Sequence, residues 1–463
     1  MKILFFTPIN RSYVSMPPFG IGYLASIARN RGFEVDIFDA RKGDKTYESF
    51  IEKIKNNNYD LVGASMTTFD FNPVKEHIKY IKKYSPNSII VLGGAHPSGD
   101  YSGILNDFPQ AGFAFRGEAE LGFAKFLDHL AVNKLNTNGL ELIPNLIWRK
   151  DNQIQINPWQ VVENLDTLPF PAWDLIDPRT YPKSPHGAFA ANFPVAPMVI
   201  SRGCPYNCTF CSGKSVTGLK LRRRSIDNAI SEIEFLQKNY DVREIHIEDE
   251  NFTFFKDAVK EFCLKIINHP WLKISWSLPS GIRLDTLDDE ILELMQRSGC
   301  YSAAVGVEFG TEKMHRLTNK RLNLNLIREK IKLLKKYKIK ITGFFLIGIP
   351  GETLEDMNKT IKLSLELDLD RAQFNNFMPL PGSPLYDQLK KDKNFSFDTD
   401  HFFVHDVAYA PAGISKKKLK SIQRNAYLKF YLRPKIIVKL IKEIKDLDHF
   451  KKLVYRFFDS IRG

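Results

Sequence analysis

Cysteine is scarce in this chain of 463 residues, which contains five, the first of them at Cys204. A small odd number of cysteines in a long chain, with no secretory leader expected, argues against a disulfide framework. The chain also has no second Cys-x-x-Cys pair and no nearby pair of histidines, which a four-ligand structural zinc site would need. Zinc binding is therefore a minor alternative, and Cys263 and Cys300 lie in apolar surroundings typical of buried thiols.

Long hydrophobic runs, internal repeats and low-complexity tracts are also missing. No stretch of 18 apolar residues occurs, so the sequence predicts no transmembrane span. The remaining pattern divides the chain into four parts. We expect a first α/β module at residues 1–132, a linker with a β-hairpin at 133–195, a second module at 196–395, and a basic helical extension at 396–463.

Three of the five cysteines stand together. Cys204, Cys208 and Cys211 form a Cys-x-x-x-Cys-x-x-Cys loop, with the aromatic Phe210 directly before the last of them. A 4Fe–4S cluster is held by cysteine thiolates at its iron corners, so three cysteines leave one iron open to an outside molecule. The spacing therefore predicts a cluster with an open iron, which implies chemistry rather than electron storage alone.

This loop resembles the signature of the radical S-adenosylmethionine (SAM) enzymes. In that family the loop follows the first strand of a partial (β/α)6 barrel, SAM chelates the open iron, and reductive cleavage yields a 5'-deoxyadenosyl radical. Apolar residues 196–200 lead into the loop here, and five further strand-like runs alternate with amphipathic stretches up to residue 375. The pattern predicts parallel strands with the active site at their C-terminal ends.

Polar side chains follow these predicted strands. The resemblance implies that acidic residues after the second strand hold the SAM ammonium group, and that an arginine after the third meets a carboxylate or ribose. It further places a ribose contact after the fourth strand and an adenine contact after the fifth. Helix capping is the alternative for each acidic residue. The candidate SAM contacts are Phe210, Glu248, Asp249, Glu250, Arg283, Glu308 and Gly348.

The first module alternates strand-like and helix-like segments, which is typical of a doubly wound, Rossmann-like α/β domain with its ligand at the strand ends. Gly20, Gly22 and the downstream Asp39 imitate a dinucleotide fingerprint. That fingerprint requires its first glycine directly after the strand, whereas about thirteen residues separate Phe6 from Gly20. A nicotinamide cofactor is therefore not expected.

Four segments of this module, residues 17–24, 63–68, 93–98 and 116–120, together resemble the cobalamin-binding domain that precedes some radical SAM barrels. Glycine there permits close approach of a flat macrocycle. No Asp-x-His-x-x-Gly motif occurs, so replacement of the lower base by a protein imidazole is not supported. The histidine of the third segment contacts the corrin or acts as a loop hydrogen-bonding residue. The candidate cobalamin contacts are Gly20, Gly22, Ser65, Gly93, Gly94 and His96.

Most of the net charge of +13 lies near the C-terminus. Residues 413–463 contain fifteen Lys or Arg against four Asp or Glu, a local net of +11, and their apolar residues recur at helical spacing. Three interpretations remain open. The favoured one is a helical appendage packed on the barrel; the others are an amphipathic surface for an anionic membrane and, least favoured, a nucleic-acid-binding tail.

Taken together, the resemblance implies an enzyme that uses a 4Fe–4S cluster, SAM and cobalamin to methylate an unactivated carbon of a small-molecule or lipid substrate. It also implies an electron donor such as flavodoxin or ferredoxin. Cobalamin-dependent cyclisation or rearrangement, and a non-enzymatic cobalamin or cluster sensor, are the alternatives. Oxygen-sensitive clusters and the expected lack of a leader favour a cytoplasmic location, with peripheral contact to the inner membrane surface as an option.

Overall fold

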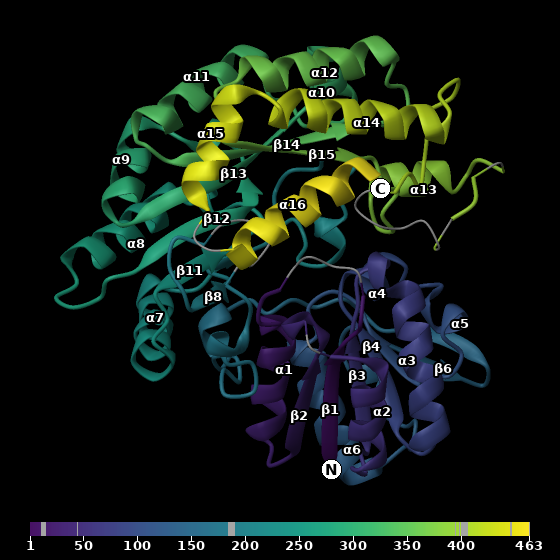
Figure 1. Ribbon diagram of the computed structural model, residues 1–463. Coiled ribbons are helices and arrows are strands. Elements are labelled where there is room, and N and C mark those ends of the chain that lie inside the picture. Colours follow the sequence, from purple (N-terminus) through teal and green to yellow (C-terminus); the bar gives the residue numbers. More distant parts are fainter. Residues whose placement is uncertain are drawn as a thin grey trace.

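The computed structural model describes residues 1–10, 15–43, 45–183, 190–393, 395–397, 399, 406–444 and 447–462. Two α/β units follow one another along the chain and lie side by side (Figure 1). The residues 184–189 of the predicted linker lie outside the described part of the chain.

The N-terminal unit is built on a seven-stranded sheet with the order β2-β1-β3-β4-β5-β6-β7. Its first five strands are parallel, and β6 and β7 add an antiparallel hairpin at one edge. Asp151 and Asn152 at the hairpin turn both have positive φ, as a two-residue type I′ turn requires. The strands are β1 (Lys2–Thr7), β2 (Glu34–Asp39), β3 (Leu61–Ser65), β4 (Ile89–Gly93), β5 (Phe113–Phe115), β6 (Leu146–Lys150) and β7 (Gln153–Ile156).

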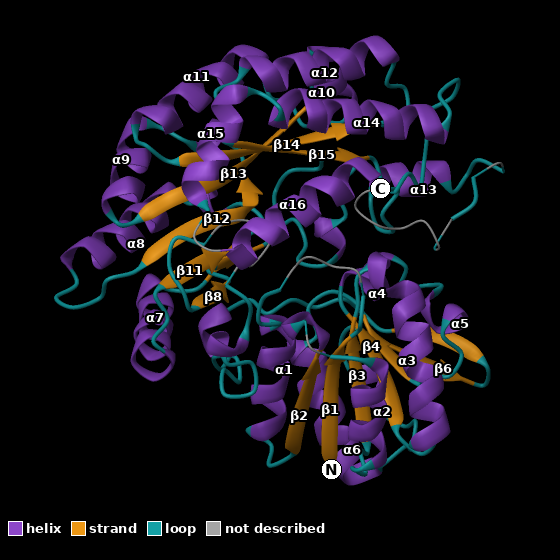
Figure 2. Cartoon of the chain, in the orientation of Figure 1, coloured by secondary structure: helices purple, strands orange, loops and turns teal. Residues whose placement is uncertain are grey.

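Helices cover both faces of this sheet (Figure 2). The two faces have separate apolar cores, because successive side chains of a strand point to opposite sides. Along β1, Leu4 and Phe6 join one core whereas Ile3 and Phe5 join the other. The helices are α1 (Phe19–Arg29), α2 (Tyr47–Lys55), α3 (Phe71–Tyr84), α4 (Ala95–Gly99), α5 (Ile104–Asp107) and α6 (Glu120–Asn133).

The second unit has a six-stranded parallel sheet with the order β15-β14-β13-β12-β11-β8. Each strand pairs with the next one along the chain, which confirms the predicted partial (β/α)6 barrel. The strands are β8 (Val195–Met198), β11 (Glu244–Ile247), β12 (Ser275–Ile282), β13 (Cys300–Glu308), β14 (Lys340–Ile347) and β15 (Arg371–Asn376). The helices between and after them are α7 (Ile226–Tyr240), α8 (Lys256–Asn268), α9 (Asp289–Arg297), α10 (Glu312–Leu317), α11 (Leu324–Lys336), α12 (Leu354–Glu366) and α13 (Pro384–Leu389).

The cysteine loop leaves the barrel through a short stem. β9 (Ser201–Arg202) pairs antiparallel with β10 (Arg222–Arg223), so the intervening residues 203–221 form a closed loop after β8. This places the three cysteines at the C-terminal end of the first barrel strand, as the sequence predicts.

Three C-terminal helices complete the chain: α14 (Lys416–Tyr431), α15 (Pro434–Glu443) and α16 (Leu447–Arg462). α14 covers the edge strand β15. The Tyr427 hydroxyl accepts a hydrogen bond from the Phe374 amide at 3.3 Å, and Gln423 donates to the Phe374 carbonyl at 2.7 Å. Unpaired backbone groups of an edge strand are a liability, and α14 satisfies them with side chains. The first of the three C-terminal helices therefore belongs structurally to the barrel.

Candidate active site

The cysteine loop is fastened to neighbouring segments by its backbone. The Cys204 amide donates to the Gly218 carbonyl at 3.2 Å within the loop. On the barrel side, the Thr209 amide donates to the Thr318 carbonyl, and the Thr209 carbonyl accepts from the Leu385 amide, both at 2.9 Å. The loop therefore holds its shape through hydrogen bonds that leave the cysteine side chains available.

The three thiols differ in burial, since Cys204 and Cys208 are half-buried and Cys211 is exposed. In the described part of the chain, no three His, Cys, Asp or Glu side chains converge on one point as a single metal ion would need. A 4Fe–4S cluster takes each thiolate at a different iron, so it does not require such convergence. The donor set and the openness of the loop fit that cluster.

A buried ion pair lies beside the loop. The Nζ of Lys320 is 3.0 Å from Oε1 of Glu308, and both side chains are largely buried. Burial lowers the pKa of Lys320, but the Glu308 carboxylate more than offsets this, so the pKa lies above its ordinary value and the amine stays charged. Burial raises the pKa of the Cys208 thiol, and the Lys320 cation opposes that rise. Lys320 thus places a positive charge next to the cluster ligands.

The backbone of β13 is shaped to make room for this pair. Glu308 has a φ of 63°, and the pairing of β13 with β14 is irregular between Gly306 and Glu308. A Cβ added at Gly306 would lie 2.5 Å from Oε1 of Glu308 and 2.7 Å from Nζ of Lys320. A larger residue at position 306 would therefore displace the ends of these two side chains. The sequence predicted Glu308 as a candidate contact but not Lys320, which follows no predicted strand and lies in a turn after α10.

The Arg283 guanidinium contacts the cysteine loop and is engaged in hydrogen bonds with neighbouring residues. Its guanidinium lies 3.7 Å from the ring centroid of Tyr206, which stands between the first two cysteines. Asp285 accepts two of its hydrogen bonds, at 3.0 and 2.8 Å, and the Lys320 carbonyl accepts a third at 3.1 Å. The arginine thus connects Tyr206 with the Lys320 turn.

The three acidic residues after β11 have different surroundings. Glu248 accepts a hydrogen bond from the Ser280 hydroxyl, and Glu250 accepts one from the Thr217 hydroxyl at 2.6 Å. Asp249 is buried, and its two oxygens accept from the Ile200 and Ser201 amides, each at 2.8 Å. Burial raises the pKa of Asp249 to about 7. Asp249 therefore holds the start of the loop stem, whereas Glu248 and Glu250 flank the loop.

Two further candidates pack on apolar neighbours. The Phe210 ring lies edge-on to Phe309, with centroids 6.1 Å apart, in a small core at the end of the barrel. Gly348 has a φ of 85°, and an added Cβ would lie 2.5 Å from a methyl group of Leu419 in α14. Gly348 therefore permits close packing of α14, and its amide donates to the buried Glu352 at 2.6 Å.

The candidate cobalamin residues of the N-terminal unit lie at or just after the ends of β3 and β4 and in the first turn of α1. Ser65 and Gly93 are paired neighbours at the ends of β3 and β4. No described atom lies within 4 Å of a Cβ added at Gly93 or Gly20, so open space adjoins both glycines. By contrast, a Cβ at Gly94 would meet the Met66 carbonyl, and one at Gly22 would meet Pro171 of the linker. Gly93 and Gly20 thus fit a flat ligand, whereas Gly22 and Gly94 serve packing.

His96 lies in α4, which directly follows Gly94. Its side chain is buried, and its Nδ1 is 3.2 Å from the Thr68 hydroxyl. Its Nε2 has no hydrogen-bond partner among the described residues. Burial lowers the pKa of His96 to about 4, so the imidazole is neutral at physiological pH.

The two units meet beside the cysteine loop. A Cβ added at Gly99 of α4 would lie 2.1 Å from the Pro381 carbonyl, and one at Gly382 would lie 2.8 Å from Cβ of Ser215. Ser215 follows Cys211 by four residues. The helix that follows Gly93 therefore contacts residues 213–215 of the cysteine loop, both directly and through Pro381 and Gly382, so the two candidate cofactor surfaces are neighbours.

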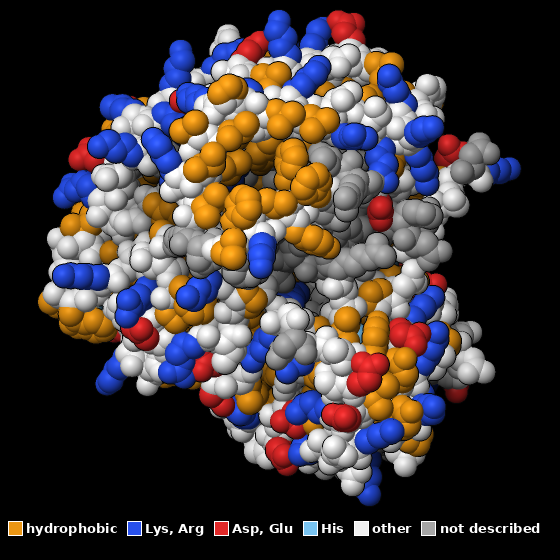
Figure 3. Space-filling model, in the orientation of Figure 1, with side chains coloured by type: hydrophobic (Ala, Val, Ile, Leu, Met, Phe, Trp, Pro, Cys, Tyr) orange, Lys and Arg blue, Asp and Glu red, His pale blue; other side chains and the backbone are white. Residues whose placement is uncertain are grey.

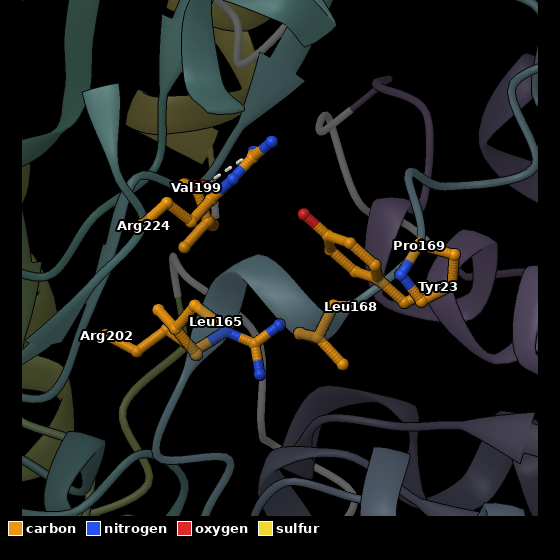
Figure 4. Close-up of a pocket in the computed structure, with 7 residues that line it drawn as sticks. All are labelled: Tyr23, Leu165, Leu168, Pro169, Val199, Arg202 and Arg224. Carbon is orange, nitrogen blue, oxygen red and sulfur yellow. Dashed lines mark hydrogen bonds between the residues drawn. The ribbon is translucent and has the colours of Figure 1, made fainter. Parts of the chain in front are cut away.

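A network of buried charges joins the units beneath the loop. Glu118 and Glu120, from the N-terminal unit, pair with Arg202 and Arg222 of the loop stem. A small cavity in this region contains none of the three loop cysteines (Figure 4). Its lining residues are Tyr23, Leu165, Leu168, Pro169, Val199, Arg202 and Arg224. It belongs to the charged interface and not to the cofactor surfaces.

Comparison with known proteins gives a separate match for the N-terminal unit and for the barrel that carries the cysteine loop. Residues 8–127 match the B12 binding domain, and residues 198–364 match the Radical SAM superfamily. The chain is 29% identical to an uncharacterized methyltransferase of Pyrococcus horikoshii, covering 96% of this chain and 95% of that protein. It is 28% identical to cytidylyl-2-hydroxyethylphosphonate methyltransferase of Streptomyces wedmorensis, covering 80% and 77%.

An anaerobic magnesium-protoporphyrin IX monomethyl ester cyclase of Rubrivivax gelatinosus is 26% identical, covering 93% of this chain and 78% of that enzyme. Among solved structures, the radical SAM methyltransferase TsrM of Kitasatospora setae, with cobalamin and a [4Fe–4S] cluster bound, shares the fold. Its TM-score is 0.70 at 16% identity, covering 97% of this chain and 92% of that one. The chain therefore combines an N-terminal B12 binding domain, at residues 8–127, with a domain of the Radical SAM superfamily, at residues 198–364.

Proposed function

We propose that this enzyme methylates an unactivated carbon of a small-molecule or lipid substrate. The observation that carries the proposal is the packing of α4 against the cysteine loop, through Gly99, Gly382 and Ser215. One substrate bound between the two surfaces would reach both cofactors. The methyltransferase relatives support methyl transfer over other outcomes.

When bound, the cluster and SAM supply a 5'-deoxyadenosyl radical, and cobalamin supplies a methyl group. The protein positions these groups and excludes water. We assign Cys204, Cys208 and Cys211 to three irons of the cluster. The thiolate form is the metal ligand, and the Lys320 cation favours it at Cys208.

We assign the SAM contacts to the charged groups that flank the loop. Glu248 and Glu250 offer carboxylates for the ammonium group, and each is oriented by one hydroxyl donor. Lys320 offers a cation for the SAM carboxylate, with Glu308 holding it in place. Opposite charges at close range in a partly buried site orient such a ligand strongly.

On the cobalamin side, we assign Ser65, Gly93 and Gly20 to the surface that meets the corrin or its tail. The glycines leave space for the ring, since an added side chain would enter that space. His96, two residues after Gly94, is a buried neutral imidazole. These residues position the ligand and carry no proton in the reaction.

The test uses anaerobically reconstituted protein with a chemical reductant and SAM bearing a trideuteromethyl group. A polar extract and a lipid extract of the source cells serve separately as substrate. A product that carries the label supports methylation and identifies the substrate class. Formation of 5'-deoxyadenosine without labelled product in either extract would contradict it.

The cyclase relative favours one second candidate, ring formation without methyl transfer. The same experiment separates the two reactions, because a cyclase yields an unlabelled product with fewer hydrogens. We further propose a cytoplasmic enzyme that receives electrons from a flavodoxin or ferredoxin. Reduction of the cluster by either purified donor, followed spectroscopically, tests that partner.

A further inference from the structure

The C-terminal helices combine two surface properties that a packed appendage does not need. Residues 413–442 contain ten Lys or Arg and no Asp or Glu. On α14, Leu419, Ile422 and Phe430 face the barrel, so the basic residues of that helix face outward. Lys417, Lys420 and Arg424 are exposed and recur at intervals of three and four, which places them on one face.

The next two helices expose apolar side chains instead. Val438 and Ile441 on α15 are 50% and 60% exposed, and Leu447 and Tyr455 on α16 are 67% and 65% exposed. The large hydrophobic residues exposed in this segment are Leu432, Ile437, Val438, Ile441, Leu447, Phe450, Tyr455 and Phe458. Figure 3 shows hydrophobic side chains gathered over α15 and α16, with Lys and Arg beside them over α14. Contiguous patches of this kind mark interaction sites.

The apolar face of α15 is held outward by contacts on its other side. Ile436 is buried against the barrel core. Lys439 pairs with Asp370 at 2.6 Å, and Arg371 pairs with Glu443 at 2.7 Å. The helix therefore cannot turn its exposed face inward without breaking these ion pairs.

We propose that α14, α15 and α16 form a docking surface for an anionic lipid bilayer. The charge and the apolar side chains of this surface distinguish between three possible binding partners: a second copy of this chain, a nucleic acid and an anionic bilayer. A second copy of this chain would bring an equally basic helix against α14, and the like charges would repel. A nucleic acid would match the charge but would leave the apolar face of α15 and α16 in water. An anionic bilayer satisfies both, because its head groups meet the Lys and Arg and its acyl boundary accepts the apolar side chains.

Such docking places the protein on the membrane surface without inserting it. Among the helices of the described residues, none is both long and apolar enough to cross a bilayer. Basic amphipathic helices lie in the plane of the interface instead. The inference depends on this surface alone and holds whether or not the proposed methyl transfer is correct.

The test is co-sedimentation of the full-length protein with vesicles of phosphatidylcholine alone or mixed with phosphatidylglycerol. We expect binding to the anionic vesicles only. Neutralising the basic face in K417Q/K420Q/R424Q should weaken it on the order of a hundredfold, since each charge near the surface contributes roughly fivefold. V438D/I441D should weaken it by roughly tenfold or more through loss of apolar contact.

Matched controls carry the same changes elsewhere. V132D/L135D places two aspartates at exposed aliphatic residues of the N-terminal unit, 81% and 61% exposed. K125Q/K332Q/K362Q removes three charges from exposed lysines outside the C-terminal helices. Both should bind like the wild type, and unchanged circular dichroism of every variant checks folding.

Three results would overturn the inference. Equal binding to neutral and anionic vesicles would remove the role of charge. A dimer in sedimentation equilibrium that V438D/I441D dissociates would assign the apolar face to a second copy. Binding of single-stranded RNA that K417Q/K420Q/R424Q abolishes, without any vesicle binding, would assign the basic face to nucleic acid.

Discussion

Glu118 and Arg222 form a bidentate, buried ion pair between the cobalamin-binding domain and the stem of the cysteine loop. The oxygens of Glu118 lie 2.6 and 2.9 Å from the two terminal guanidinium nitrogens, and both side chains are 3% exposed. Arg222 also donates to the carbonyls of Val162 and Thr217, each at 2.7 Å. One residue pair thus connects the first domain, the linker and the loop.

Removing the carboxylate of this pair should destabilise the protein strongly. Glu118→Ala leaves a buried guanidinium without its counter-ion, so we expect a loss of about 3–5 kcal/mol in the free energy of unfolding. Urea unfolding measures it. The control is Glu163→Ala, which breaks an exposed pair with Lys220 of the same 2.6 Å length. That change should cost little stability, because exposed ion pairs contribute little, and equal losses for the two variants would contradict a special role of the buried pair.

Replacing a loop cysteine should abolish the cluster. Cys208→Ala removes one of the three assigned thiolates, so we expect loss of bound iron and of reductive SAM cleavage. Cys263→Ala is the control, because that thiol is buried in the barrel core and burial raises its pKa to about 12. Iron content and 5'-deoxyadenosine formation are measured after anaerobic reconstitution. Unchanged SAM cleavage in Cys208→Ala would refute the cluster assignment.

Lys320 should govern SAM affinity. Lys320→Met removes the cation proposed for the SAM carboxylate and leaves Glu308 without its partner, so the Kd for SAM should rise roughly tenfold or more. Lys313→Met is the control, since that lysine is exposed and pairs with Asp356 in a neighbouring helix. Equilibrium binding of SAM to the reconstituted protein measures the effect. A Kd equal to that of the control would remove Lys320 from the SAM site.

Gly93 offers a test of the cobalamin surface that leaves the apoprotein intact. An alanine Cβ there would meet no atom of the described residues within 4 Å, so Gly93→Ala should not change the stability of the apoprotein. It would project into the proposed corrin space, and we expect cobalamin affinity to fall roughly tenfold or more. Gly112→Ala also enters open space but lies at no assigned contact. If the two variants bind cobalamin equally, as judged by its absorbance change, the assignment of Gly93 is wrong.

Because Glu352 is a buried carboxyl group, we expect the stability of the protein to depend on pH. Burial raises its pKa to about 8 from an ordinary 4.5, so the folded chain holds this proton more tightly than the unfolded chain. Its contribution to stability is complete below about pH 4.5 and is lost as the pH rises toward 8. The free energy of unfolding of Glu352→Gln, compared with that of the wild type, should therefore rise by on the order of a few kcal/mol as the pH increases across that window.

Urea unfolding at several pH values measures this gain. The control is Glu355→Gln, which changes an exposed carboxylate of the following helix. Its stability difference from the wild type should vary little with pH. A pH-independent difference for Glu352→Gln as well would show that Glu352 does not titrate in this way.

The sequence by itself determined the features that depend on local spacing. The spacing of the loop cysteines, the alternation of strands and helices, and the acidic or glycine residues at strand ends are patterns within a few residues. Cys208, Glu308 and Gly93 could therefore be proposed as candidate site residues without a structure. The physical reason is that side-chain periodicity and ligand spacing are properties of the local backbone.

Only the tertiary structure decided which of these residues face the same space. Asp249 follows a strand like Glu248, yet its oxygens are taken by the amides of Ile200 and Ser201. Lys320 follows no strand, yet it pairs with Glu308, where the pairing of β13 with β14 shifts register. The buried pair of Glu118 and Arg222 joins residues 104 positions apart. Such neighbours are created when separate elements pack, and no local pattern in the sequence records that packing.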